Sequence, residues 1–254
     1  MSILNLFNLS GTRALVTGGS GGLGRALAEA LHEAGAEVAV AGVSERSQAV
    51  AAEIGRDGPR VIALRADLAQ RAAARELYEE AVHTLGQVDN LVTAHGVVHR
   101  SRAEDYPAEE WERVVEVNLN SVFALCQLAG REMLARGRGK IINIVSLLSF
   151  SGGLTVPAYA ASKGGVAQLT KALANEWAGR EVNVNAIAPG YFDTPLSTAL
   201  LADPVRSRQI LERIPAGRWG QPADLKGAAV FLASRASDYV HGVILPVDGG
   251  WLAR

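Results

Sequence analysis

The sequence has almost no net charge, a single cysteine and no basic leader, and each of these excludes a class of protein. Lys and Arg number 25 against 26 Asp and Glu, a net charge of −1, which offers no basic surface to nucleic acid or to an anionic membrane. The one cysteine, Cys126, forms no internal disulfide, as is usual in a reducing compartment. The first residues, MSILNLFNLSG, lack the basic segment and cleavage site of a signal peptide. We therefore expect a cytoplasmic protein with no nucleic-acid or membrane partner.

What the sequence does contain is an alternation of short apolar runs with longer amphipathic ones. We expect strands at 13–17, 37–42, 60–65, 89–94, 139–145, 181–187 and 242–247. The intervening runs predict helices at 23–34, 45–56, 70–86, 108–135, 158–178 and 222–234. Such an alternation is typical of a parallel sheet buried on both faces. The sequence therefore predicts one α/β domain over 1–254, a Rossmann-type doubly wound parallel sheet of about seven strands with helices on both faces.

One stretch, 190–215, is proline-rich and irregular, and we expect it to form a lid over the carboxyl edge of the sheet, where substrates bind in this architecture. Charged residues make up only 20% of the chain, below the usual value of about 25%. This low fraction favours a surface that is partly buried in an oligomer.

A glycine-rich turn, TGGSGGLG at 17–24, follows the first predicted strand and opens a helix. Glycines at 18, 22 and 24 let the backbone turn sharply and approach a pyrophosphate, which the helix N-terminus attracts. A plain tight turn is the alternative, but the position in the first βαβ unit favours a dinucleotide site. No carboxylate for the ribose 2′-hydroxyl ends the second strand, where Gly42 stands. Ser44 and Arg46 follow it and favour NADP over NAD, although Arg46 as a solvated charge leaves NAD open.

Three residues of the second half suit proton transfer at a carbinol. Tyr159 and Lys163 lie four residues apart in a predicted helix and share one face, and Ser146 ends the preceding strand. A phenol is a weak acid with a pKa near 10, and a neighbouring ammonium lowers that value towards the operating pH. The spacing alone also fits an incidental surface pair, but its combination with Ser146 and the glycine turn indicates hydride transfer with a nicotinamide.

These motifs resemble the short-chain dehydrogenase/reductase family along the whole chain. The matching pieces are TGGSGGLG, Asp67-Leu68, EVNLNSVF with Asn118, Ser146, Tyr159-x3-Lys163, Pro189-Gly190 and the terminal VDGGWLAR. The resemblance implies that Tyr159 is the general acid/base, that Lys163 lowers its pKa and holds the nicotinamide ribose, that Ser146 orients the substrate oxygen and that Asn118 positions a water. With the glycine turn, the expected cofactor contacts are Gly18, Ser20, Gly22, Leu23, Gly24, Ser44, Arg46, Asp67, Leu68, Gly96, Tyr159, Lys163, Pro189, Gly190, Phe192 and Thr194.

One segment departs from the family pattern. Family members usually carry Asn-Asn-Ala-Gly after the fourth strand, where this chain has Thr93-Ala94-His95-Gly96. The first Asn normally ties neighbouring strands together, so we expect Thr93 to weaken that tie. His95 either perturbs the local proton balance or only packs and forms hydrogen bonds, and we favour the second interpretation. His95 and His99 have the spacing of a metal pair, but no third ligand is near in the sequence, so no metal is predicted.

The second half is also similar to sugar-acid dehydrogenases of the 2-deoxy-D-gluconate 3-dehydrogenase and gluconate 5-dehydrogenase type. A carboxylate substrate needs a cation, preferably a guanidinium. We predict Arg100 as a substrate residue beside Ser146 and Tyr159; further candidates, each of which also reads as a solvated charge, are His99, Arg102, Arg213 and Arg218. Trp251 is a candidate for packing against a neighbouring subunit, because family members are often homotetramers. A 3-oxoacyl-thioester reductase and a cofactor-sensing binding protein without turnover remain as alternatives.

Overall fold

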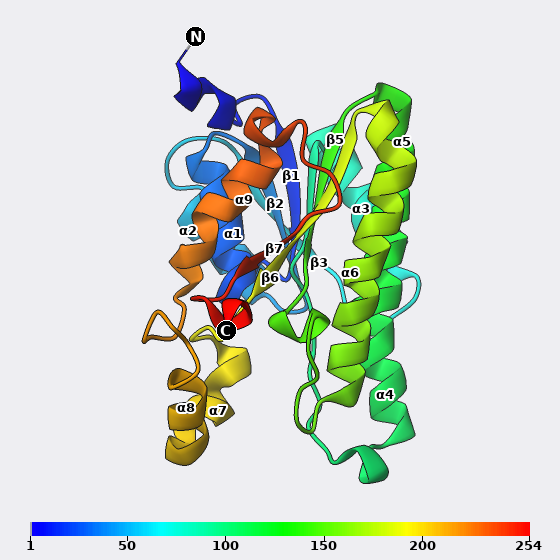
Figure 1. Ribbon diagram of the computed structural model, residues 1–254. Coiled ribbons are helices and arrows are strands. Elements are labelled where there is room, and N and C mark those ends of the chain that lie inside the picture. Colours follow the sequence, from blue (N-terminus) through cyan, green and yellow to red (C-terminus); the bar gives the residue numbers. More distant parts are fainter. Residues whose placement is uncertain (1) are drawn as a thin grey trace.

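Seven parallel strands form the sheet at the centre of the molecule, in the order β3-β2-β1-β4-β5-β6-β7 (Figure 1). The computed structural model describes residues 2–254. The strands are β1 (Arg13–Thr17), β2 (Glu37–Gly42), β3 (Val61–Arg65), β4 (Asn90–Thr93), β5 (Gly139–Ile144), β6 (Val182–Pro189) and β7 (Ile244–Val247). The chain order reverses between β1 and β4, and ligands of doubly wound sheets bind outside the carboxyl ends of the strands at such a reversal. The predicted fold class is therefore confirmed.

Helices cover both faces of the sheet (Figure 1). One face carries α1 (Gly22–Glu33), α2 (Arg46–Ile54) and α9 (Lys226–Ala233). The other carries α3 (Ala73–Leu85), α4 (Ala108–Val115), α5 (Ser121–Arg136) and α6 (Pro157–Trp177). Because the sheet is buried on both sides, its strands are apolar throughout rather than alternating. No helix within residues 2–254 is long and apolar enough to cross a membrane.

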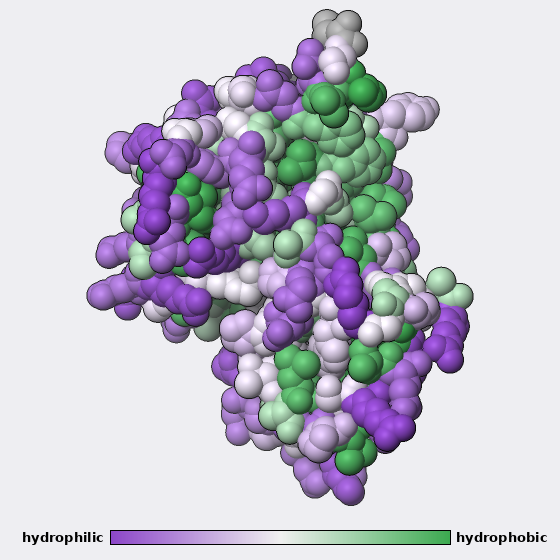
Figure 2. Space-filling model, turned by 90° about the vertical axis from the view of Figure 1, so that its left-hand side faces the viewer, coloured by the Kyte–Doolittle hydropathy of each residue, from purple (hydrophilic) through white to green (hydrophobic). Residues whose placement is uncertain are grey.

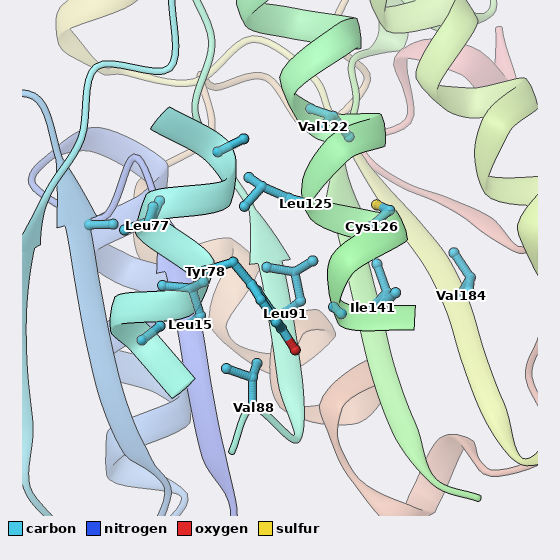
Figure 3. Packing of buried hydrophobic residues seen from close by; sticks show 14 of the residues in the cluster. Leu15, Leu77, Tyr78, Val88, Leu91, Val122, Leu125, Cys126, Ile141 and Val184 are labelled. Atoms are coloured by element: carbon cyan, nitrogen blue, oxygen red, sulfur yellow. The ribbon is translucent and has the colours of Figure 1, made fainter. Parts of the chain in front are cut away.

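Two apolar clusters sandwich the sheet, and β1 shows how one strand serves both. Leu15 points into the cluster beneath α3 and α5, whereas Ala14 and Val16 pack on the side of α1 and α9. Figure 3 shows the first cluster, in which Leu77 and Leu125 converge on the strands from two helices. Burial of one such leucine contributes roughly 1.5–3 kcal/mol, so the strands hold the carboxyl edge of the sheet rigidly.

The helix expected over 108–135 is interrupted. α4 and α5 are joined by a π-helical turn, Glu116–Asn120. A π turn inserts one extra residue into the hydrogen-bond ladder and is often found at functional sites. The insertion leaves the apolar pattern nearly unchanged, so the sequence reads as one continuous helix.

Thr93, which we expect to tie the strands less firmly than an asparagine, does form a tie in this structure. The hydroxyl of Thr93 donates to Oδ1 of Asn143 on β5 at 2.8 Å, and Asn143 in turn donates to Thr170 of α6 at 3.0 Å. Thr93 on β4 thus connects this strand to β5 through a side chain that is shorter than the asparagine of the family pattern.

The stretch 190–215 is more regular than expected, since it contains two short helices, α7 (Thr198–Ala202) and α8 (Pro204–Leu211). Both stand beyond the carboxyl end of β6, apart from the body of the molecule (Figure 1). A small apolar cluster anchors them, in which Trp251 packs on Tyr191 with ring centroids 4.8 Å apart. Trp251 is therefore buried within its own chain, and the expectation that it packs against a neighbouring subunit is wrong.

The surface on the side of α1 and α9 is mostly polar (Figure 2). Hydrophobic residues gather on it near the N-terminal end of the chain (Figure 2), where Ile3 and Leu4 are 67% and 73% exposed.

Candidate active site

A cavity of about 1080 Å³ opens at the carboxyl edge of the sheet, between the glycine turn and the segment that carries α7 and α8. Ligand sites span roughly 300–1,000 Å³, so this one has room for an extended ligand together with a second, smaller molecule. Every residue predicted above to contact the cofactor lines this cavity, as do Ser146 and Arg100.

The glycine turn fits closely against the neighbouring loop. Gly18 adopts a φ of +67°, and a β-carbon at this position would lie 2.8 Å from the carbonyl oxygen of Ala94 and from the Cα of His95. A β-carbon at Gly24 would collide with the carbonyl of Gly18. Only glycine fits at either position, so the N-terminus of α1 can approach an anion with its free N–H groups.

The tip of β2 is crowded by hydroxyl groups. A β-carbon at Gly42 would lie 2.6 Å from the Oγ atoms of both Ser20 and Ser47, so a carboxylate side chain there would force both hydroxyls to move. Arg46 lies across the glycine turn, with its guanidinium carbon 3.6 Å from the position of a β-carbon on Gly21. Hydroxyls and a cation at this end of the cavity suit a phosphate ester rather than a bare ribose hydroxyl.

Ser146, Tyr159 and Lys163 come together at the other end. The Oγ of Ser146, at the end of β5, accepts a hydrogen bond from the N–H of Leu148 at 3.1 Å, which fixes the side chain. Tyr159 and Lys163 project from the first two turns of α6, with the Nζ of Lys163 5.9 Å from the centre of the phenol ring. Lys163 is 4% exposed and donates to the carbonyl of Ile144 at 2.8 Å.

Burial dominates the acidity of both groups. It raises the pKa of the Tyr159 phenol, against the opposing effects of the Ser146 hydroxyl and the Arg100 charge. It lowers the pKa of Lys163 to about 8. The sequence-based expectation assigned the lowering of the phenol pKa to Lys163; in the structure Ser146 and Arg100 act in that direction and burial outweighs them.

Asn118 lies within the π-helical turn and is fully buried. Its Oδ1 accepts from the N–H of Val97 at 2.8 Å, and its Nδ2 donates to the carbonyl of Val97 at 2.9 Å and to the Ser162 hydroxyl at 3.2 Å. The side chain does not line the cavity. It clamps the loop after β4, so any contact of this turn with a water must come from its backbone.

The two histidines of the 95–99 stretch have separate partners. His95 forms hydrogen bonds with Thr17 and Ser121 at 2.6 and 2.8 Å, as the favoured interpretation expects. His99 packs edge-on against Tyr106 and lies 3.5 Å from Glu110. Within residues 2–254, no group of three His, Cys, Asp or Glu side chains is arranged to hold a metal ion.

The arginines predicted to contact the substrate fall into two groups, those that line the cavity and those that pair with other residues. Arg100 lines the cavity, and the adjacent Ser101 N–H donates at 3.0 Å to the carbonyl of Thr155, which ties the loops after β4 and β5 together. The other candidates are engaged elsewhere: Arg102 with Glu104 at 3.7 Å, Arg218 with Asp224 at 2.7 Å, and Arg213 over the ring of Trp251 at 4.0 Å.

A further cation, Arg206 on α8, also lines the cavity and escaped the sequence-based search. In the part of the chain that the structure describes, neither Arg206 nor Arg100 has a carboxylate within 4 Å, unlike Arg208 two residues further along α8, which pairs with Glu212 at 2.8 Å. An arginine inside the predicted lid is a signal for a substrate contact. The irregular sequence of 190–215, however, predicts no helix face that would direct Arg206 towards the cavity.

Comparisons with known proteins agree with this geometry. A family model described as enoyl-(acyl carrier protein) reductase matches residues 18–252. The 2-dehydro-3-deoxy-D-gluconate 5-dehydrogenase of Bacillus subtilis is 52% identical, with 98% of this chain and 97% of the relative covered. Among solved structures, the gluconate 5-dehydrogenase of Burkholderia cenocepacia, in complex with NADP and tartrate, has a TM-score of 0.95 at 40% identity and full coverage of both chains.

A 3-oxoacyl (acyl-carrier-protein) reductase from Agrobacterium tumefaciens with NADP bound is more distant, with 32% identity, a TM-score of 0.91 and coverage of 98% and 97% of the two chains. Fold, cavity and coverage along nearly the whole length lead to one conclusion: this chain belongs to the short-chain dehydrogenase/reductase family, and it is an oxidoreductase.

Proposed function

We propose that the protein interconverts a secondary alcohol and a ketone on a small sugar acid, with NADP preferred over NAD. The observation that carries the proposal is a single cavity in which Ser146, Tyr159 and Lys163 face one end of a dinucleotide cleft. Arg100 and Arg206 supply two guanidinium groups without carboxylate partners among the described residues. A polyhydroxy carboxylate matches this combination of a proton-transfer site and free cations.

Tyr159 is the general acid/base of this proposal. The Ser146 hydroxyl holds the substrate oxygen, and the Tyr159 phenolate takes the hydroxyl proton during oxidation and becomes the neutral phenol. The Ser146 hydroxyl and the Arg100 charge stabilise the phenolate before this step, and the Lys163 ammonium lies beside it, 5.9 Å from the centre of the ring. The bound nicotinamide supplies the hydride acceptor. Asn118 acts on this site through the loop that it clamps, and the backbone of its π-helical turn is where a water would continue the proton path.

The cofactor contacts proposed are those predicted from the sequence, since all of them line the cavity. Asp67 and Leu68 flank the adenine end, and Pro189, Gly190, Phe192 and Thr194 flank the nicotinamide end. The preference for NADP rests on Ser44 and Arg46 and on the crowding of Gly42, where an acid would displace two serine hydroxyls. Crystals of two relatives with bound NADP agree with it.

A sugar acid is favoured over an acyl thioester by two arginines that have no carboxylate partner among the described residues, and by the relatives. Identity is 52% to a 2-dehydro-3-deoxy-D-gluconate 5-dehydrogenase and 40% to a gluconate 5-dehydrogenase, and falls to 32% for the 3-oxoacyl reductase. Tartrate in the structure of the gluconate enzyme is itself a hydroxy acid.

We further propose that 190–215 serves as the substrate lid within one domain spanning 1–254, and that the protein is a homotetramer of the cytoplasm. The lid assignment is supported by Arg206, which brings a cation from α8 to the cavity. Trp111 of α4 and Phe123 of α5 are 42% and 43% exposed, and the charged fraction is 20%, which supports association of subunits. Light scattering tests the assembly: a monomer at micromolar concentration contradicts it.

The decisive experiment is a substrate panel. Gluconate, 2-deoxygluconate and an acetoacetyl thioester are each assayed with both cofactors in the direction that each allows. We expect the highest kcat/KM on a sugar acid with the NADP couple. Highest kcat/KM on the thioester would replace the proposal with an acyl reductase, and tight cofactor binding without turnover on any compound would indicate a cofactor-sensing protein.

A further inference from the structure

His95 lines the cavity beside Lys163 and is 8% exposed. Its ring spans from the end of β1 to the start of α5. Nδ1 is 2.6 Å from the Thr17 hydroxyl and Nε2 is 2.8 Å from the Ser121 hydroxyl. Neither the proton transfer nor the substrate contacts proposed above use this residue.

The partners of the ring determine which nitrogen carries the proton. The Ser121 hydroxyl donates to the carbonyl of Val117 at 2.7 Å, and a His95 ring protonated at Nε2 donates in turn to Ser121 and satisfies both contacts. Nδ1 then has a free lone pair and accepts from the hydroxyl of Thr17 at 2.6 Å, a shorter contact than the 3.3 Å from that hydroxyl to the carbonyl of Val92. The result is a directed chain of hydrogen bonds from Thr17 through His95 and Ser121 to Val117.

The ring stays neutral throughout the working range of pH. Burial and the nearby charge of Lys163 lower the pKa of His95 to about 3. Lys163 on α6 is the charged group that acts on the ring, while its contacts from β1 and α5 are the uncharged hydroxyls of Thr17 and Ser121. A neutral ring keeps one donor and one acceptor, which is what the directed chain requires.

The chain joins the two segments that border the cleft. Thr17 begins the glycine turn, and Val117 belongs to the π-helical turn that carries Asn118. Between them the backbone is tightly stacked: a β-carbon at Gly18 would lie 2.8 Å from the Cα of His95, and one at Gly96 would lie 3.3 Å from Oδ1 of Asn118 and 3.5 Å from the Nζ of Lys163. A displacement of His95 therefore shifts both the glycine turn and the π-helical turn, the two segments that border the cleft.

We propose that His95 is a positioning residue, which fixes the glycine turn against the π-helical turn and so sets the width of the cleft beside Lys163. The inference rests on the proposed function, because it assigns that cleft to a nicotinamide dinucleotide. It predicts that the hydrogen bonds of the ring contribute to cofactor affinity as well as to stability.

Three variants test this. His95→Phe keeps a planar ring without its nitrogens, Ser121→Ala breaks the same chain without adding volume, and His95→Gln restores one donor and one acceptor. The matched control is Thr170→Val, which removes a buried hydroxyl that accepts from Asn143 at 3.0 Å away from the cavity. NADPH affinity is measured by fluorescence titration, and melting temperature by calorimetry.

We expect His95→Phe and Ser121→Ala each to raise the Kd for NADPH about tenfold, the equivalent of one positioned hydrogen bond. His95→Gln should recover most of that loss. Thr170→Val should lower the melting temperature with an unchanged Kd. A Kd unchanged in both chain-breaking variants overturns the inference, as does a His95→Gln protein that binds no better than His95→Phe.

The same titration separates this inference from the proposed function. Wild-type protein that binds NADPH and fails to oxidise any sugar acid refutes the substrate assignment and leaves the role of His95 to be judged by the Kd values. Wild-type protein that binds neither NADPH nor NADH refutes both.

Discussion

Lys163 is predicted to destabilise the folded protein at neutral pH, and replacing it with Met tests this. Burial lowers the pKa of its ammonium from the usual 10.5 to about 8. Between these two values the unfolded chain binds more protons than the folded one, so stability rises with pH across this window. The pKa difference corresponds to about 3 kcal/mol of unfolding free energy, of which about 2 kcal/mol develops between pH 7 and about pH 9.5.

The measurement is urea unfolding of wild type and Lys163→Met at both pH values, followed by tryptophan fluorescence. The variant also loses the hydrogen bond to the Ile144 carbonyl, but that loss is nearly the same at both pH values. We expect wild type to gain about 2 kcal/mol relative to the variant at the higher pH.

Lys171→Met is the matched control, because Lys171 is exposed on the same helix and its ammonium stays in water. This control should show the same stability difference from wild type at both pH values. If the difference between wild type and Lys163→Met is also the same at both, or moves in favour of the variant as the pH rises, the reasoning about the buried ammonium is refuted.

Four further variants probe the cavity. Tyr159→Phe should lower kcat about 10²–10⁴-fold with the Kd for NADPH close to wild type; retained turnover would contradict the acid/base assignment. Arg206→Gln should raise KM for gluconate about tenfold with little change in kcat, whereas Arg208→Gln, which removes an arginine paired outside the cavity, serves as its control and should leave KM unchanged. Arg46→Gln should weaken NADPH binding about tenfold and spare NADH. Equal weakening of both cofactors would contradict a contact between Arg46 and the 2′-phosphate. Gly42→Asp should weaken both cofactors because the new side chain meets Ser20 and Ser47; improved NADH binding would show that the crowding is misjudged.

Most of the fold was predictable because it depends on local patterns. The strand limits at 13–17 and 37–42 agree with the structure, since a buried parallel strand is apolar at every position and ends in turn residues. The glycine turn and the Tyr159–Lys163 pair were identifiable from spacing, because backbone sterics and helix periodicity fix what such spacings place together.

What escaped prediction depends on contacts between distant segments. The π-helical turn at Glu116–Asn120 changes hydrogen bonding without changing the apolar pattern. The direction of the Asn118 side chain, towards Val97 rather than the cavity, follows from that turn. Arg206 reaches the cavity only because α8 is anchored beyond β6 by an apolar cluster, which no spacing in the sequence reveals.

The crowding at Gly42 has a consequence for the evolution of cofactor preference. Any larger residue at that position meets the hydroxyls of Ser20 and Ser47, both 2.6 Å from where its β-carbon would lie. A side chain at this position requires both serine hydroxyls to turn away, so an acidic strand tip depends on positions 20 and 47 as well as on position 42. A laboratory library aimed at cofactor choice should therefore vary positions 20, 42 and 47 together.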